Sequence, residues 1–282
     1  MAPAVRERPL IIAGPCAAES FELMDAVASH LCRLAAELDF DYIFKASFDK
    51  ANRTSASSIR GRGLDTTLKW FGDLKSRYGV RILTDIHETH QIPAVAQVCD
   101  VLQIPAFLCR QTDLVVGAAQ TGRMVNIKKG QFMAPAAMAS IVNKARTAAQ
   151  EAGSSGEILL TERGVSFGYG NLIVDMRALP IMAKTKAPII LDITHSTQLP
   201  AAGGEGGEVS GAQRQFAPVL ARAATATGYL SGYFLEVHTD PPRAISDKDA
   251  QLNLHQSELL LRQLIPLWQH SRPLATIDQH FK

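Results

Sequence analysis

An apolar strand leads directly into a charged loop in the stretch Asp41-Tyr-Ile-Phe-Lys-Ala-Ser-Phe-Asp-Lys-Ala-Asn-Arg-Thr-Ser55. Residues 41–44 are mainly apolar and aromatic, and this pattern predicts a short strand. The loop that follows contains two lysines, an arginine, an asparagine and hydroxyl side chains. These groups can hold phosphate and carboxylate on a small polyhydroxylated ligand. For a basic run taken alone, a solvated loop is the alternative interpretation.

The same alternation of strand and helix runs along the whole chain. Apolar runs predict strands at residues 10–14, 41–44, 80–84, 101–104, 124–127, 157–161, 188–193 and 233–237. Periodicity and composition predict helices at residues 23–38, 64–78, 92–98, 114–120, 135–150, 216–227 and 257–268. Strand-then-helix units without an interior linker predict a (β/α)8 TIM barrel, a single domain over residues 1–282, rather than an open doubly wound sheet. No GxGxxG motif follows the first strand, which disfavours dinucleotide binding.

Composition excludes several classes of partner. The 282 residues carry a formal net charge of +2, so neither nucleic acid nor a membrane surface is an expected partner. The four cysteines form no CxxC pair, and the N-terminus lacks an apolar signal segment. We therefore expect a cytoplasmic protein that binds small molecules or copies of itself.

Polar side chains stand at the carboxyl end of each predicted strand. In a TIM barrel these ends form the functional rim. The residues expected to face it are Cys16, Lys45, Asp85, Gln103, Lys128, Arg163, His195 and Glu236.

Barrel closure predicts a metal site. It places the last strand between the first and seventh, which makes Cys16, His195 and Glu236 neighbours. With an aspartate from residues 240–249, this set suits one divalent transition metal ion, Zn²⁺, Fe²⁺, Mn²⁺ or Co²⁺. Asp240, Asp247 and Asp249 are all candidates on spacing alone. A small buried cysteine and a core histidine are the alternatives for Cys16 and His195.

Positive charge is expected to gather at the same rim. Lys45, Lys50, Lys128 and Arg163 would repel one another there unless a ligand with phosphate and carboxylate groups enters. Alternatively, one of them pairs with Asp85 or Glu162.

Several motifs together resemble those of the 3-deoxy-D-manno-octulosonate 8-phosphate synthases. They occupy residues 12–20 (IAGPCAAES), 44–55 (FKASFDKANRTS), 103–113 (QIPAFLCRQTD), 126–132 (NIKKGQF), 162–169 (ERGVSFGY) and 192–195 (DITH). The resemblance implies condensation of phosphoenolpyruvate with D-arabinose 5-phosphate in lipopolysaccharide biosynthesis. The related 3-deoxy-arabino-heptulosonate 7-phosphate synthases use erythrose 4-phosphate and typically carry Lys-Pro-Arg-Thr-Ser. Asn52 favours the arabinose enzyme, and the erythrose enzyme is the alternative.

The resemblance also assigns roles to individual residues. Cys16 implies the metal-dependent subclass, with ligands Cys16, His195, Glu236 and Asp247. The implied phosphoenolpyruvate pocket contains Lys45, Lys50, Lys128, Gln131 and Arg163. Asn52 would meet the sugar hydroxyls, and Arg53 with Thr54 would bind the sugar phosphate from a neighbouring subunit of a homotetramer. Gln103 and His195 are further expected substrate contacts, and the expected catalytic residues are Lys45, Lys50, Asn52, His195 and Asp247. Residues 203–211 and 238–250 are candidate lids.

Overall fold

Eight parallel strands close into a barrel in the computed structural model, which describes residues 6–51, 60–166, 170–203 and 209–281. Around the barrel the order is β1, β12, β9, β6, β5, β4, β3 and β2. These strands are β1 (Leu10–Gly14), β2 (Asp41–Lys45), β3 (Arg81–Asp85), β4 (Val101–Ile104), β5 (Met124–Lys128), β6 (Ile158–Glu162), β9 (Ile189–Asp192) and β12 (Gly232–Glu236). The predicted TIM barrel is confirmed.

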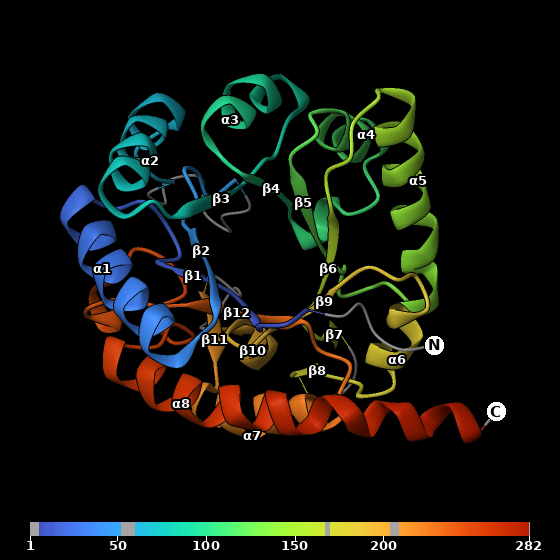
Figure 1. The fold of residues 1–282 in the computed structure, drawn as a ribbon. Helices are drawn as coiled ribbons and strands as arrows, with labels where there is room; N and C mark the ends of the chain where they lie inside the picture. Colours follow the sequence, from blue (N-terminus) through green and yellow to red (C-terminus); the bar gives the residue numbers. More distant parts are fainter. Residues whose placement is uncertain (1–5, 52–59, 167–169, 204–208, 282) are drawn as a thin grey trace.

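Helices cover the outside of the barrel (Figure 1). They are α1 (Phe21–Leu38), α2 (Leu64–Tyr78), α3 (Ile92–Val98), α4 (Thr112–Gln120), α5 (Met138–Glu151), α6 (Ala178–Ala183), α7 (Ala217–Ala226) and α8 (Leu254–Ser271). Helix α1 begins two residues before the predicted position 23, because the Ser20 side chain caps it by accepting a hydrogen bond from the Leu23 backbone N–H.

The strands are buried on both faces, which explains their nearly continuous apolar sequences. Alternate residues point outward to the helices or inward to the barrel core. The inner cluster contains Leu10, Ile12, Ile43, Leu83, Val101, Leu159, Ile190 and Phe234. This packed interior leaves the carboxyl ends of the strands as the place where a cavity forms.

Three features were not predicted from sequence. Helix α6 has only six residues, too few to show a helical period. Two small hairpins extend from the carboxyl rim: β7 (Val165–Ser166) with β8 (Leu172–Ile173), and β10 (Gln198–Gly203) with β11 (Val209–Ala212). The candidate lid at 203–211 therefore belongs partly to the second hairpin, and its residues 204–208 lie outside the described part.

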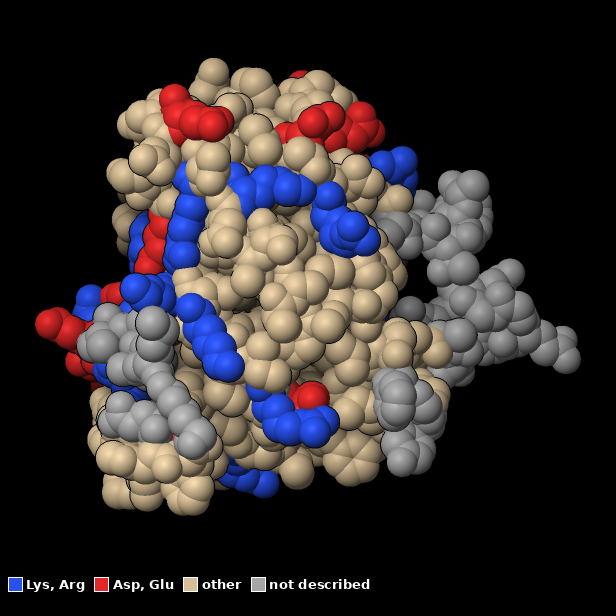
Figure 2. All heavy atoms as spheres, turned by 90° about the vertical axis from the view of Figure 1, so that its right-hand side faces the viewer, with Lys and Arg blue, Asp and Glu red and all other residues tan. Residues whose placement is uncertain are grey.

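The surface shows no broad basic face on the side seen in Figure 2, where Lys and Arg form a broken arc among uncharged residues. Among the described residues, no helix has both the length and the apolar character needed to cross a membrane.

Candidate metal and anion site

A cavity of about 580 Å³ opens at the carboxyl ends of the barrel strands. Nine of the residues predicted for the site line it: Lys45, Lys50, Gln103, Lys128, Gln131, Arg163, His195, Glu236 and Asp247. The Phe234 ring lies beneath two of the cations, with Lys128 Nζ 3.6 Å and Lys45 Nζ 5.5 Å from its centroid. An aromatic face attracts such cations and helps to hold them in the cavity.

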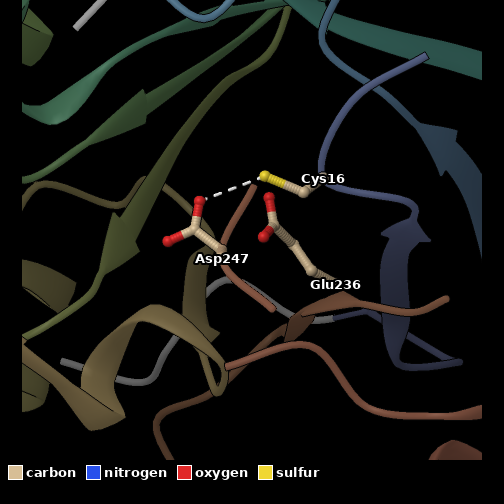
Figure 3. A group of neighbouring side chains, drawn as sticks. All are labelled: Cys16, Glu236 and Asp247. Carbon is tan, nitrogen blue, oxygen red and sulfur yellow. Dashed lines mark hydrogen bonds between the residues drawn. The ribbon is translucent and has the colours of Figure 1, made fainter. Parts of the chain in front are cut away.

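Three of the four predicted metal ligands converge, and Figure 3 shows their side chains pointing toward one another. One ligand atom each from Cys16, Glu236 and Asp247 lies within 4.8 Å of the others. The Cys16 thiol donates a hydrogen bond to Asp247 Oδ2 at 3.2 Å. Glu236 is fully buried, and its Oε2 has no hydrogen-bond partner among the described residues. A buried carboxylate oxygen without a partner is costly, and a cation would satisfy it.

His195 stands beside this group rather than within it. Its Nε2 lies 3.6 Å from Glu236 Oε1, while its Nδ1 lies 2.8 Å from Asp192 Oδ2. The Asp192 carboxylate also accepts the His195 backbone N–H at 2.9 Å. Metal-binding histidines typically use a carboxylate in this way to orient the ring, so the arrangement suits a ligand that presents Nε2 to a cation.

Local charge favours ionised carboxylates and a protonated thiol. Burial, reinforced by Glu236, raises the pKa of the Cys16 thiol well above its usual range. Burial alone would raise the pKa of Asp247, but the opposing effect of His195 and Lys50 is larger and lowers it. A divalent cation would replace the thiol proton, because a metal binds the thiolate. The donor set therefore fits a transition metal ion.

Close approach of β1 and β2 brings a lysine into the same group. A Cβ atom at Gly14 would lie 2.0 Å from the Lys45 carbonyl oxygen, so only glycine fits there. Lys45 is almost fully buried, and its Nζ donates to Glu236 Oε1 at 2.7 Å and to the Cys16 carbonyl oxygen at 2.9 Å.

The expectation of four uncompensated cations needs correction. Lys45 pairs with Glu236, and Lys128 pairs with Asp192 at 2.6 Å. These partners differ from the proposed Asp85 and Glu162, because Glu162 lies 3.4 Å from the neighbouring Lys129 instead. Burial would lower the pKa of Lys50, but its Coulombic interactions with Cys16 and with the carboxylates of Glu236 and Asp85 outweigh burial and raise it. Lys50 Nζ faces Ser47 Oγ at 3.0 Å and remains charged.

Gln198 links the anion-binding and metal-binding parts of the site, and sequence reasoning missed it. Its side-chain oxygen accepts from Arg163, and its Nε2 donates to Asp247 Oδ1 at 2.6 Å. Asp192 was also missed, although it opens the motif that ends in His195. No sequence signal marks Gln198, because the β10 hairpin brings it to the cavity.

Comparison with known proteins identifies the family. Residues 5–271 match the model of the DAHP synthetase I family. The chain belongs to the DAHP synthetase I family. Two similar relatives are called 2-dehydro-3-deoxyphosphooctonate aldolase. The relative from Delftia acidovorans is 51% identical, with 92% of this chain and 90% of the relative covered. The relative from Nitrobacter winogradskyi is 53% identical, with 92% of this chain and 88% of the relative covered.

Three residues predicted for the sugar end of this DAHP synthetase I family site, Asn52, Arg53 and Thr54, lie outside the described residues. The flanks of their loop are described, and the Lys50 backbone N–H donates to the Arg60 carbonyl oxygen at 2.8 Å. The loop therefore leaves and rejoins the barrel beside the cavity that Lys50 lines.

Asp85 and His87 form a polar pair at the edge of the same cavity, with Asp85 Oδ2 and His87 Nε2 2.8 Å apart. Burial lowers the pKa of His87, but the Asp85 carboxylate outweighs it and raises the pKa above the usual value. The folded-state pKa thus exceeds the unfolded one. The pair therefore adds stability below about pH 6.5, and this is lost as the pH rises through the raised pKa.

Replacing Asp85→Asn is expected to move the pKa of His87 below its usual value, because burial then dominates. NMR titration of the His87 ring in the metal-free protein measures this. Asp175→Asn, which removes a carboxylate paired with exposed Arg177, is the control and leaves His87 unchanged. Equal His87 titrations in Asp85→Asn and the parent protein would contradict the assignment.

Proposed function

We propose that the chain condenses phosphoenolpyruvate with D-arabinose 5-phosphate and water to give 3-deoxy-D-manno-octulosonate 8-phosphate and inorganic phosphate. The observation that carries the proposal is one cavity in which Lys45, Lys128 and Arg163 stand next to a Cys, Glu and Asp donor set. The name shared by relatives at about half identity supports it. We also propose that the reaction belongs to lipopolysaccharide biosynthesis, as the resemblance implies. We place it in the cytoplasm, a reducing compartment that suits the four free thiols.

The cations of the cavity bind and orient the substrates. Lys128, Arg163 and Gln131 hold the carboxylate and phosphate of phosphoenolpyruvate through charge-assisted hydrogen bonds. Gln131 would donate to these anions through Nε2, and its buried Oε1, which has no hydrogen-bond partner in the described structure, can accept from a ligand hydroxyl or a water molecule. Holding two anionic substrates with C3 of the enol against the sugar aldehyde supplies much of the rate enhancement.

The reaction then follows from charge development. C3 of phosphoenolpyruvate bonds to the aldehyde carbon, and the aldehyde oxygen takes up a proton. Positive character develops at C2, water adds there with loss of a proton, and the C2–O bond breaks to release phosphate and leave the ketone. Lys50 stays protonated in the cavity, where it would stabilise the negative charge that develops on the aldehyde oxygen before that oxygen takes up its proton.

The metal is part of the proposal, with Cys16, His195, Glu236 and Asp247 as its ligands. When bound, one divalent transition metal ion would neutralise the buried carboxylates and act as a Lewis acid toward the aldehyde or a water molecule. Asp192, whose Oδ2 lies 2.8 Å from His195 Nδ1, would orient the ring so that Nε2 faces the ion.

Phosphate release from phosphoenolpyruvate tests the function. The assay compares arabinose 5-phosphate with erythrose 4-phosphate, each before and after chelation and after return of a divalent ion. We expect activity with the five-carbon sugar alone. Chelation is expected to remove this activity, and return of the divalent ion is expected to restore it. Chelator-resistant activity would remove Cys16 from the mechanism, and preference for erythrose 4-phosphate would establish the alternative enzyme.

Arg53→Ala is expected to raise the Michaelis constant for arabinose 5-phosphate by about 10- to 150-fold, because a charge-assisted phosphate contact contributes about 1.5 to 3 kcal/mol. We propose that this contact crosses subunits of a homotetramer and includes Thr54, while Asn52 meets the sugar hydroxyls. Arg60→Ala is the matched control in the same loop, since Arg60 pairs with Asp49. An unchanged constant in Arg53→Ala would remove Arg53 from the phosphate site.

Cys16→Asn is expected to keep partial activity that resists chelators. The resemblance implies a second, metal-free subclass with asparagine in place of this cysteine, and an amide can still hydrogen-bond to Asp247. Turnover with and without a chelator measures the effect. Complete inactivity would show that positions other than 16 also determine metal independence.

A further inference from the structure

The two loops that carry Cys16 and Asp247 come from opposite ends of the chain. One follows β1, and the other follows β12. A metal site preformed from both loops needs contacts that fix their separation. Two buried or half-buried side chains, Gln251 and Glu19, make such contacts.

Gln251 joins the backbones next to both ligands. Its Oε1 accepts the Cys16 backbone N–H at 3.1 Å, and its Nε2 donates to the Ser246 carbonyl oxygen at 2.9 Å. The residue is 0% exposed, so both ends of the amide are bound inside the protein. An amide is the side chain that can accept from one loop and donate to the other at once.

The backbone of Gln251 is fixed as well. Its N–H donates to the Asp247 carbonyl oxygen at 3.0 Å, and its carbonyl oxygen accepts from Arg214 Nη1 at 2.7 Å. Asp247 itself has a φ of 48°, a left-handed conformation that is unfavourable for a residue with a Cβ. Such a conformation persists where surrounding contacts impose it.

Glu19 provides a second connection to the segment that immediately precedes Asp247. Its Oε1 accepts the Ile245 backbone N–H at 3.2 Å. The two residues before Asp247 are thus both tied to the loop of Cys16, Ile245 through Glu19 and Ser246 through Gln251. The Cys16 to Asp247 distance is therefore set by groups that are not themselves metal ligands.

We propose that Gln251 is a positioning residue that presets the distance between Cys16 and Asp247 for a divalent transition metal ion, with Glu19 as its supporting contact. The inference rests on the proposed metal-dependent function. Groups that orient metal ligands typically change metal affinity by about 10- to 100-fold when they are removed.

Gln251→Met tests the inference, because methionine has similar size but makes neither hydrogen bond. The dissociation constants for Co²⁺ and Zn²⁺, measured by chelator competition at a temperature where the variant is folded, are expected to rise about 10- to 100-fold. The visible spectrum of the Co²⁺ form is expected to change, since thiolate and carboxylate geometry alters. Gln150→Met makes the same change at an exposed position of α5. This control is expected to leave the dissociation constants and the Co²⁺ spectrum unchanged.

Enzyme kinetics distinguish a role of Gln251 in positioning the metal ligands from a general loss of protein stability. In Gln251→Met the metal concentration for half-maximal activity is expected to rise by the same factor as the dissociation constant. The Michaelis constant for phosphoenolpyruvate at saturating metal is expected to stay near that of the parent. If Gln251→Met does not fold, Glu19→Ala supplies the test, and its dissociation constants for Co²⁺ and Zn²⁺ are expected to rise. Glu19→Gln keeps the acceptor oxygen and is expected to restore the dissociation constants of the parent.

Unchanged metal affinity in Gln251→Met and Glu19→Ala, with affinity lost in Cys16→Ala, would overturn the inference. A parent protein that binds Co²⁺ but releases no phosphate from the substrates would refute the proposed reaction, and the affinity of Gln251→Met would still decide the role of Gln251. A parent protein that binds no Co²⁺ would overturn both.

Discussion

Cys16→Ala is expected to weaken metal binding by more than about 100-fold and to remove activity at ordinary metal concentrations. Loss of groups that only orient ligands already costs about 10- to 100-fold, so loss of a direct ligand costs more. Of the three remaining proposed donors, His195 offers a nitrogen, and Glu236 and Asp247 are carboxylates that bind soft ions less well than a thiolate does. Chelator competition measures the affinity, and phosphate release measures the activity.

The fold itself is expected to survive this substitution. Cys16 is fully buried, but it is small, and its backbone N–H stays bonded to Gln251. Cys32→Ala, which removes a half-buried thiol from α1, is the matched control and is expected to retain both metal binding and turnover. Unchanged turnover in metal-stripped Cys16→Ala would disprove the catalytic need for metal.

The neighbourhood of Cys16 and Glu236 could be predicted because barrel closure follows from the strand count. Once eight parallel strands are recognised, the first must pair with the last. The structure pairs Gly14 with Glu236, which puts the residue after Pro15 beside that carboxylate. The same reasoning predicted that Lys45, Lys128, Arg163 and His195 lie at one rim. Strand periodicity therefore carries information about the site as well as the fold.

Side-chain pairing inside the cavity could not be predicted in the same way. A strand pattern places Lys128 at the rim, but it does not say that Asp192, rather than Glu162, becomes its partner. That choice depends on barrel register and on backbone turns after each strand. Gln198 reaches the site at the start of the unpredicted β10 hairpin, and Gln251 reaches it from an irregular loop, for which neither period 2 nor period 3.6 exists.

One such pairing has a large expected energetic effect. Lys45 Nζ and Glu236 Oε1 are 2.7 Å apart, and the side chains are 2% and 0% exposed. Removing one member of a buried ion pair leaves the other charge without compensation, which typically costs about 3 to 5 kcal/mol. Lys45→Met is therefore expected to lower the free energy of unfolding of the metal-free protein by about that amount.

Surface ion pairs give the comparison. Lys75 pairs with Asp100 at 2.8 Å, but these side chains are 35% and 23% exposed. Water screens such a pair, so Lys75→Met is expected to cost about 0 to 1 kcal/mol. Denaturant unfolding of both variants, in the presence of a chelator, measures the difference. Equal losses in the two variants would show that Glu236 finds another partner when Lys45 is removed.

A second measurement on Lys45→Met is the change in its free energy of unfolding when a metal ion binds. In the parent protein Lys45 already neutralises Glu236 and competes with any cation for that carboxylate. Without the lysine, Glu236 is left to the cation alone, so metal is expected to bind the variant more tightly and to stabilise it more than the parent. Adding Zn²⁺ should therefore narrow the gap in unfolding free energy between the two proteins. A gap that widens with Zn²⁺ would mean that Lys45 supports the metal site instead of competing with it.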